Sequence, residues 1–142
     1  MSRYVVDASV VAKWVLPVEP HQEEALRLKA DNVAGRNELF APAILSVEVA
    51  NALWKAVRMN RLSREDAKAA LAALGHMGVF LCEFKWDRVS EIFDIACRLE
   101  VAVYDAAYLY LAQEIKAQFV TSDDALFEKS KSHFQVLNVR DY

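Results

Sequence analysis

The chain has 142 residues, of which 55% are hydrophobic and 26% are charged, and its formal net charge is −3. This composition excludes a disordered chain, and the length predicts a single domain, 1–142, with a substantial core. The acidic balance excludes nucleic-acid binding by bulk positive charge, so a nucleic-acid partner would need a local basic patch or bound cations.

Predicted strands and helices alternate along the whole chain. Short apolar runs predict strands at residues 3–7, 39–41, 79–82, 119–121 and 134–139. Apolar spacing near 3.6, together with Pro, Ser and Gly at the ends, predicts helices at residues 8–16, 20–34, 42–57, 63–75, 87–99, 104–116 and 124–131. This alternation predicts an α/β fold whose mostly parallel sheet is covered by helices on both faces.

Several features bear on where the protein works. The longest weakly charged stretch, residues 69–82, is interrupted by polar residues and glycines and is too short to span a membrane. The first residues lead directly into a strand, so no signal peptide is expected. Cys82 and Cys97 match no metal or redox spacing and are expected to be buried thiols. We therefore expect a cytoplasmic protein.

Four acidic residues stand where apolar segments start, stop or change direction. Asp7 and Asp123 each follow a predicted strand, so both carboxylates are expected at the same edge of a parallel sheet. Asp105 lies in the first turn of its helix, and Glu48 lies in mid-helix on a partly inward face, where it needs a cation nearby. Each acid also has a structural alternative, because carboxylates cap helices and stabilise their first turns.

Each acid lies in a short segment of its own. The segments are Val5-Val6-Asp7-Ala8-Ser9, Ser46-Val47-Glu48-Val49-Ala50-Asn51-Ala52-Leu53, Tyr104-Asp105-Ala106-Ala107-Tyr108-Leu109-Tyr110-Leu111-Ala112 and Thr121-Ser122-Asp123-Asp124-Ala125-Leu126. In this order and spacing they resemble the four motifs of PIN-domain nucleases, and the resemblance extends from residue 5 to about residue 139. Among that family, the VapC-type toxins of prokaryotic toxin–antitoxin pairs have a similar size and layout.

The resemblance implies a fold, an activity and partners. The fold is a three-layer α/β/α PIN-like fold with a mostly parallel central sheet of four to five strands. The activity is that of an endoribonuclease dependent on Mg²⁺ (or Mn²⁺), with Asp7, Glu48, Asp105 and Asp123 as catalytic residues and metal ligands. The partners are an RNA substrate, a second copy of the chain in a homodimer, and a VapB-type antitoxin protein of a type II toxin–antitoxin system.

Other polar residues are candidates for supporting roles. Ser9 and Thr121 resemble the hydroxyl residues that accompany the acids in the family, although helix capping is the alternative for both. Asp124 is expected to cap a helix or support the ligands, and Lys13, one helical turn after Ser9, is a candidate contact for an RNA phosphate. A further basic run is either a solvated face or a surface for RNA or antitoxin; it comprises Lys55, Arg58, Arg61, Arg64 and Lys68.

Other functions remain as alternatives. A phosphoryl-transfer domain built around Asp7 would want a second acid close to it and a lysine after a late strand, and the sequence has neither. A non-catalytic binding module of the same fold is a second alternative, although all four acids are present. A PIN-domain nuclease that processes RNA without acting as a toxin is the third.

Overall fold

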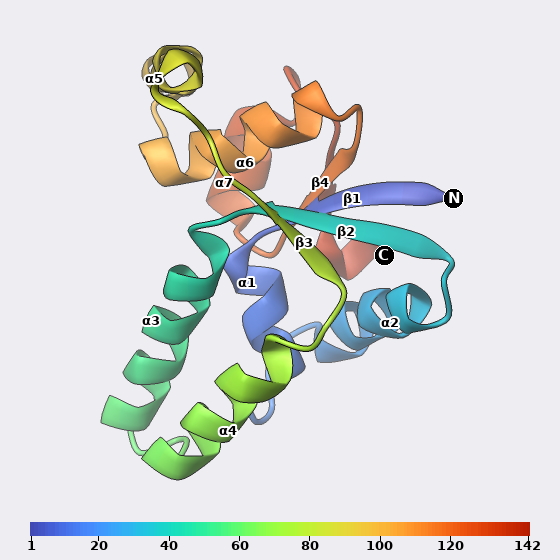
Figure 1. Cartoon of the computed structure of the whole chain (residues 1–142), viewed down its shortest axis with the longest axis vertical. Helices are drawn as coiled ribbons and strands as arrows, with labels where there is room; N and C mark the ends of the chain where they lie inside the picture. Colours follow the sequence, from blue (N-terminus) through green and yellow to red (C-terminus); the bar gives the residue numbers. More distant parts are fainter.

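Five short strands pair in parallel in the order β3-β2-β1-β4-β5 in the computed structural model of residues 1–142 (Figure 1). The strands are β1 (Ser2–Val6), β2 (Asn37–Pro42), β3 (Val79–Cys82), β4 (Gln118–Thr121) and β5 (Val136–Asn138). The centre of the sheet is β1, where Val5 and Val6 are fully buried because helices cover both faces. The predicted parallel sheet is confirmed.

Helices form a layer on each side of this sheet. They are α1 (Ala8–Val11), α2 (Gln22–Val33), α3 (Leu45–Arg58), α4 (Arg64–Leu74), α5 (Trp86–Leu99), α6 (Val103–Glu114) and α7 (Asp124–Ser130). One layer consists of α1 to α4, and the other consists of α5 to α7 (Figure 1). Right-handed crossovers explain this division, because the chain moves one way across the sheet from β1 to β3 and returns the other way to β5. The three-layer α/β/α prediction is confirmed.

Local sequence signals account for several helix ends. The side chain of Ser63 accepts a hydrogen bond from the Asp66 backbone N–H and caps α4. Gly35 follows α2 with a positive φ of 74°, a conformation that suits glycine. The predicted helix 8–16 is instead one turn of α1 followed by a 3₁₀ turn, η1 (Ala12–Trp14). The last strand is shorter than predicted because a second 3₁₀ turn, η2 (Val139–Asp141), begins where it stops.

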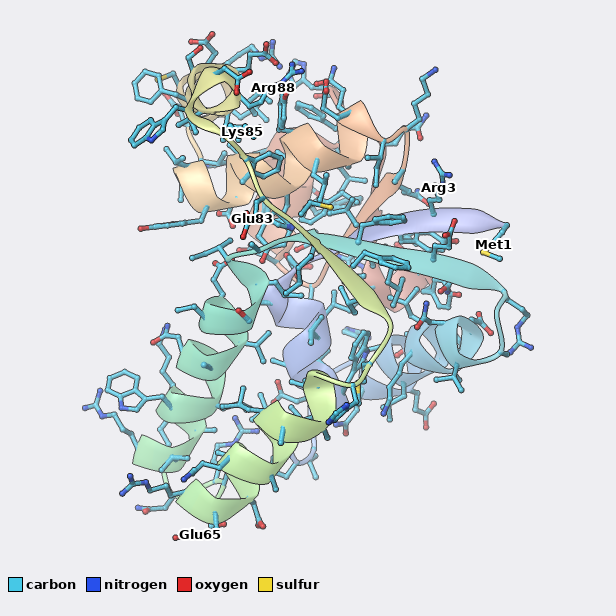
Figure 2. The ribbon with its side chains drawn as sticks, viewed as in Figure 1. Met1, Arg3, Glu65, Glu83, Lys85 and Arg88 are labelled. Atoms are coloured by element: carbon cyan, nitrogen blue, oxygen red, sulfur yellow. The ribbon has the colours of Figure 1, made fainter.

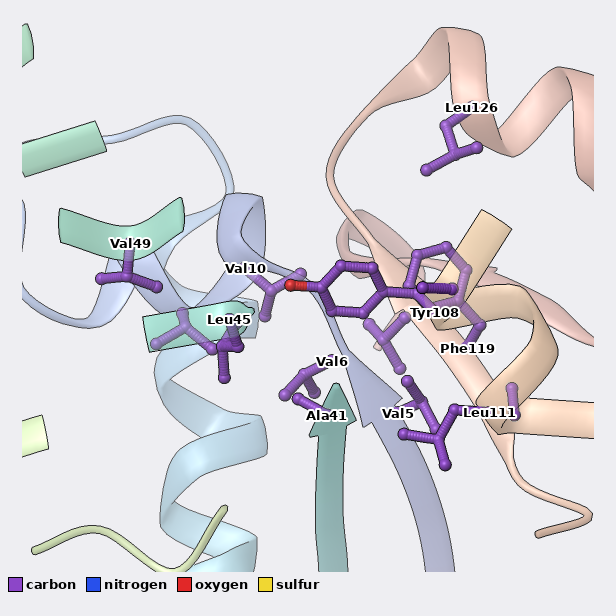
Figure 3. Packing of buried hydrophobic residues seen from close by; sticks show 14 of the residues in the cluster. Val5, Val6, Val10, Ala41, Leu45, Val49, Tyr108, Leu111, Phe119 and Leu126 are labelled. Atoms are coloured by element: carbon purple, nitrogen blue, oxygen red, sulfur yellow. The ribbon is translucent and has the colours of Figure 1, made fainter. Parts of the chain in front are cut away.

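The core connects α6 to the sheet. Seven consecutive residues of α6, from Ala106 to Ala112, are buried. The ring of Tyr108 packs against that of Phe119 with 5.9 Å between their centroids, and its hydroxyl points away from Phe119 toward the side of Val10 and Leu45 (Figure 3). Because α6 is packed all round, the residues in its first turn are held firmly relative to the carboxyl ends of the strands.

The prediction that both cysteines are buried is wrong. Both thiols are free, but Cys82 is half-buried and Cys97 is exposed. Cys97 lies on the outer side of α5, whose buried residues are Ile92, Ile95, Ala96 and Leu99. No helix in the structure combines the length and the apolarity needed to cross a membrane.

Candidate active site

The four acids that the sequence singled out line one cavity. It has a volume of about 650 Å³ and lies where α1, α3 and α6 meet the carboxyl ends of β1 and β4. This is the place in an open parallel sheet where ligands bind. Its lining comprises Asp7, Ala8, Ser9, Ile44, Val47, Glu48, Asn51, Ala52, Lys55, Tyr104, Asp105, Tyr108 and Asp123.

Asp7 is the most buried of the four acids, with 6% of its surface exposed. It follows β1 and caps α1, accepting a hydrogen bond from the Val10 backbone N–H at 3.2 Å. The hydroxyls of Ser9 and Thr121 each donate to one of its carboxylate oxygens at 2.5 Å. Burial raises the pKa of Asp7 to about 6, although these hydrogen bonds oppose the shift.

Glu48 enters the cavity from α3 and is oriented by α6. The Tyr108 hydroxyl donates a hydrogen bond to Glu48 Oε1 at 2.7 Å. Burial, followed by this hydrogen bond to the carboxylate, raises the pKa of Tyr108, so the phenol stays protonated and remains a donor. Tyr108 therefore links the core directly to an acid of the cavity.

Asp105 and Asp123 complete the acidic lining. The Asp105 carboxylate takes part in no hydrogen bond, and burial, followed by the nearby charges of Asp123 and Glu48, raises the pKa of Asp105 to about 6. Asp123 caps α7 by accepting a hydrogen bond from the Leu126 backbone N–H at 3.0 Å. The structural alternative for Asp7 and Asp123, that each caps a helix, is thus confirmed, and the same side chains also face the cavity.

Two hydroxyls tie the first acidic segment to the last. Fully buried Thr121 donates to Asp7 and accepts a hydrogen bond from the Asp123 backbone N–H at 3.0 Å. Ser9 also donates to Asp7, and its oxygen accepts from the Ser122 backbone N–H at 2.9 Å. Each hydroxyl therefore uses both its donor and its acceptor, which fixes the carboxylate of Asp7 relative to β4.

The donor set of the cavity suits a hard divalent cation. Its acids supply only carboxylate oxygens, the ligands that Mg²⁺ and Mn²⁺ prefer, and neither histidine nor cysteine lines the cavity. No three of these side chains are drawn together closely enough to form a coordination site as they stand. Burial and then repulsion from Asp123 and Glu48 raise the pKa of Asp105, and this repulsion opposes such an approach in the absence of a cation.

Three of the supporting residues predicted from sequence do not line the cavity: Thr121, which still contacts Asp7, and Lys13 and Asp124. Lys13 lies in η1 and is only 6% exposed, so its position does not support the expected phosphate contact. Asp124 points away toward β5, where its carboxylate accepts a hydrogen bond from Asn138 at 2.8 Å, with Arg140 at 3.8 Å. Asp124 therefore fits a structural role in the first turn of α7.

The sequence prediction missed Tyr108 and Asn51 as residues of the cavity, and it placed Lys55 only in the basic run. Tyr108 follows Asp105 by three residues, and Asn51 and Lys55 follow Glu48 by three and seven. These spacings place side chains on one face of a helix, so helical periodicity counted from each acid puts all three near the face of that acid.

The two acids with raised pKa values predict an unusual pH dependence of stability. Asp7 and Asp105 have folded-state pKa values of about 6 against an ordinary value of 3.8, so the stability they contribute below pH 4 is lost as the pH rises through 6. In buffer with a chelator, we expect the free energy of unfolding to fall by about 1–2 kcal/mol between pH 5 and pH 7.5, after discounting half-exposed Asp105 for screening. The melting temperature should fall by roughly 3–6 °C.

Thermal melts monitored by circular dichroism at the two pH values measure this difference. The Asp105→Asn variant is the control, because a neutral side chain of the same shape should shrink the difference. The pKa of Asp31 is lowered, so its contribution changes mainly below pH 4 and leaves this window clear. A melting temperature that rises between pH 5 and pH 7.5 would contradict the assignment of raised pKa values.

The fold and the acid-lined cavity together define the class of protein. The PIN domain profile matches residues 4–131, and the chain belongs to the PIN domain family. Among curated proteins it is similar to Ribonuclease VapC3 of Pyrobaculum aerophilum, with 35% identity over 128 residues that cover 89% of this chain and 94% of the relative. The resemblance inferred from the four acidic segments is confirmed.

Solved structures agree with the fold. PAE2754 from Pyrobaculum aerophilum superposes with a TM-score of 0.71 at 24% identity, covering 99% of this chain and 91% of that chain. VapBC2 from Rickettsia felis, solved with a DNA fragment from its promoter, gives a TM-score of 0.67 at 12% identity over 96% and 98% of the two chains. At these identities the similarity establishes the architecture.

Proposed function

We propose that this chain is an endoribonuclease dependent on Mg²⁺ (or Mn²⁺) and the toxin of a type II toxin–antitoxin pair. The observation that carries the proposal is the single cavity lined by four carboxylates from all four PIN-like segments. A relative named Ribonuclease VapC3 matches over nearly its whole length, which supports RNA as the substrate. In this proposal residues 1–142 act as one PIN domain in a cytoplasmic homodimer that a VapB-type antitoxin holds in check.

We assign Asp7, Glu48, Asp105 and Asp123 as the catalytic acids and metal ligands. Divalent cations, when bound to such carboxylates, polarise a phosphate and make a water molecule more acidic. Ser9 and Thr121 hold the Asp7 carboxylate from two sides, and Tyr108 holds Glu48. Asp105 has no hydrogen-bond partner and is therefore the acid with the most freedom to turn toward a ligand. The cavity walls keep these groups partly out of water, which strengthens their electrostatic effects.

Cleavage of a labelled, structured RNA pool by the purified chain tests this proposal. We expect internal cleavage with Mg²⁺ or Mn²⁺ and none with a chelator, and we expect restoration when the metal is returned in excess. Calorimetric titration with Mn²⁺ should detect binding by the same preparation. Cleavage that continues undiminished in the chelator would contradict metal dependence, and a folded chain that neither binds Mn²⁺ nor cuts RNA would be a non-catalytic module of this fold.

Replacing Tyr108 by Phe should slow cleavage by about 10–100-fold, the usual cost of losing a group that orients a metal ligand. The substitution keeps the ring that packs on Phe119 and removes only the donor to Glu48. The measurement is the single-turnover cleavage rate, with Mn²⁺ affinity determined in parallel. Tyr110→Phe on the same helix is the matched control, because Tyr110 does not line the acidic cavity. Equal cleavage rates in Tyr108→Phe and Tyr110→Phe would contradict the proposal that Tyr108 orients Glu48.

A further inference from the structure

One face of α3 runs outward from the acidic cavity. Glu48, Asn51 and Lys55 line the cavity, and Trp54 and Arg58 lie beside them at helical spacing on the next turns. The opposite face of α3 is the core face, formed by Leu45, Val49, Leu53 and Ala56. No other element covers the outer side of α3, from which side chains extend into open space (Figure 2). We call Asn51, Trp54, Lys55 and Arg58 the α3 track.

Trp54 is the aromatic residue of the α3 track. Its side chain is 53% exposed, although the Arg58 guanidinium lies over the ring at 4.9 Å from the centroid. Core packing does not account for this residue, because it projects from the outer side of the helix. The cation holds the indole in place, and the exposed part of the ring remains open to a flat partner.

The positive charges of the α3 track are not neutralised by ion pairs. Lys55 is the only cationic residue that lines the acidic cavity. Neither Lys55 nor Arg58 takes part in an ion pair, whereas Arg61, one turn further, is engaged by Glu19 at 2.9 Å. Lys55 and Arg58 therefore form a local positive surface on a chain whose net charge is −3. An anionic partner is complementary to it.

We propose that the α3 track binds a single-stranded segment of RNA adjacent to the cleaved phosphate. A base stacks on Trp54, neighbouring phosphates contact Lys55 and Arg58, and the strand continues into the acidic cavity past Asn51. This inference rests on the proposed function. It adds that the α3 track is the surface that holds the RNA and that the RNA is bound as a single strand. Stacking on an aromatic ring beside cations is the usual means of holding unpaired nucleotides without reading their sequence. An RNA strand fits better than a protein partner, because two of the four residues of the α3 track are cations that take part in no ion pair.

Binding of a short, unstructured, fluorescein-labelled oligoribonucleotide tests the α3 track. The parent is the Asp105→Asn variant with Mg²⁺ present, so that the RNA stays intact and fluorescence anisotropy reports affinity alone. Adding Trp54→Ala should weaken binding by about tenfold, the loss typical of one stacked base. Adding Lys55→Gln with Arg58→Gln should reduce the slope of log affinity against log salt by about 1.4, since each single-strand phosphate contact contributes about 0.7.

Two controls separate the α3 track from general effects of charge and aromaticity. Trp86, which is 91% exposed at the start of α5, is replaced by Ala, and exposed Arg98 at the end of α5 is replaced by Gln. Both should leave affinity and salt slope at the parent values. The parent's tryptophan fluorescence should also be quenched by the RNA, and this quenching should disappear with Trp54→Ala.

The outcomes distinguish this inference from the proposed function. Unchanged affinity, salt slope and quenching in the track variants, in a chain that cuts RNA with metal, would overturn the α3 track alone and leave that face to a protein partner. Failure of the parent to bind RNA, together with failure of the wild type to cut it, would overturn both.

Discussion

The Asp105→Asn variant is expected to cleave RNA at least about 1,000-fold more slowly than the wild type. Loss of a group that merely orients a metal ligand costs about 10–100-fold, and loss of a proposed ligand should cost more. The change is close to isosteric and removes one negative charge from the cavity. Because Asp105 accepts no hydrogen bond, no structural contact is lost, and removing repulsion from Asp123 and Glu48 should raise the melting temperature in a chelator.

The control for this variant is Asp87→Asn. Asp87 occupies the first turn of α5 as Asp105 occupies the first turn of α6, but it is exposed and lies outside the cavity. Cleavage rates are compared at saturating Mn²⁺, and calorimetry gives the Mn²⁺ affinity of each variant. Wild-type rates in Asp105→Asn would exclude this carboxylate from catalysis. Slow cleavage by Asp87→Asn as well would point to a general electrostatic effect.

The Thr121→Val variant is expected to lose about 3 kcal/mol of unfolding free energy and most of its activity. Valine preserves the shape of the fully buried side chain, but Asp7 loses a donor and the Asp123 N–H loses its acceptor. Each buried group left without a partner costs about 1–3 kcal/mol. A loss of this size lowers the melting temperature by roughly 6–12 °C in a chain of this length.

Urea unfolding gives the free energy, and cleavage is measured at a temperature where the variant is still folded. Thr121→Ser is the matched variant, because it keeps the hydroxyl and removes only a methyl group; it should retain most of the activity. If Thr121→Ser and Thr121→Val lose activity equally, packing of the methyl group and not the hydroxyl orients the Asp7 carboxylate. The hydrogen bonds of Thr121 would then make no contribution to cleavage.

The meeting of three of the acids in one cavity could be predicted from sequence, because each of the three lies at a strand end or a helix start. Asp7 and Asp123 follow strands that turn out to be neighbours, β1 and β4, so their carboxylates reach the same edge of the sheet. Asp105 is fixed by the first turn of a helix that is buried on nearly all sides. Strand ends and helix starts can be read from local patterns, and the parallel order then brings the acids together.

Other features of the site depend on side-chain directions, which the sequence does not reveal. The sequence predicts that Lys13, one turn after Ser9, can reach an RNA phosphate, whereas its side chain in η1 is buried. Tyr108 looked like an ordinary core residue of α6, since nothing local indicates that its hydroxyl reaches Glu48, 60 positions earlier in the chain. Contacts of this kind arise from tertiary packing, which periodicity alone does not determine.

The hydrogen bonds of the Ser9 and Thr121 hydroxyls, which join the segment after β1 to β4 and the residues after it, also determine when the cavity forms. These hydrogen bonds join residues separated by 113 and 114 positions, so the loop that must close includes most of the chain. A ribosome makes the chain from its N-terminus, and contacts between distant segments form late. On the proposed function, a growing chain that already carries Asp7, Glu48 and Asp105 is therefore harmless to the RNA around it until Thr121 has been added and β4 has joined β1.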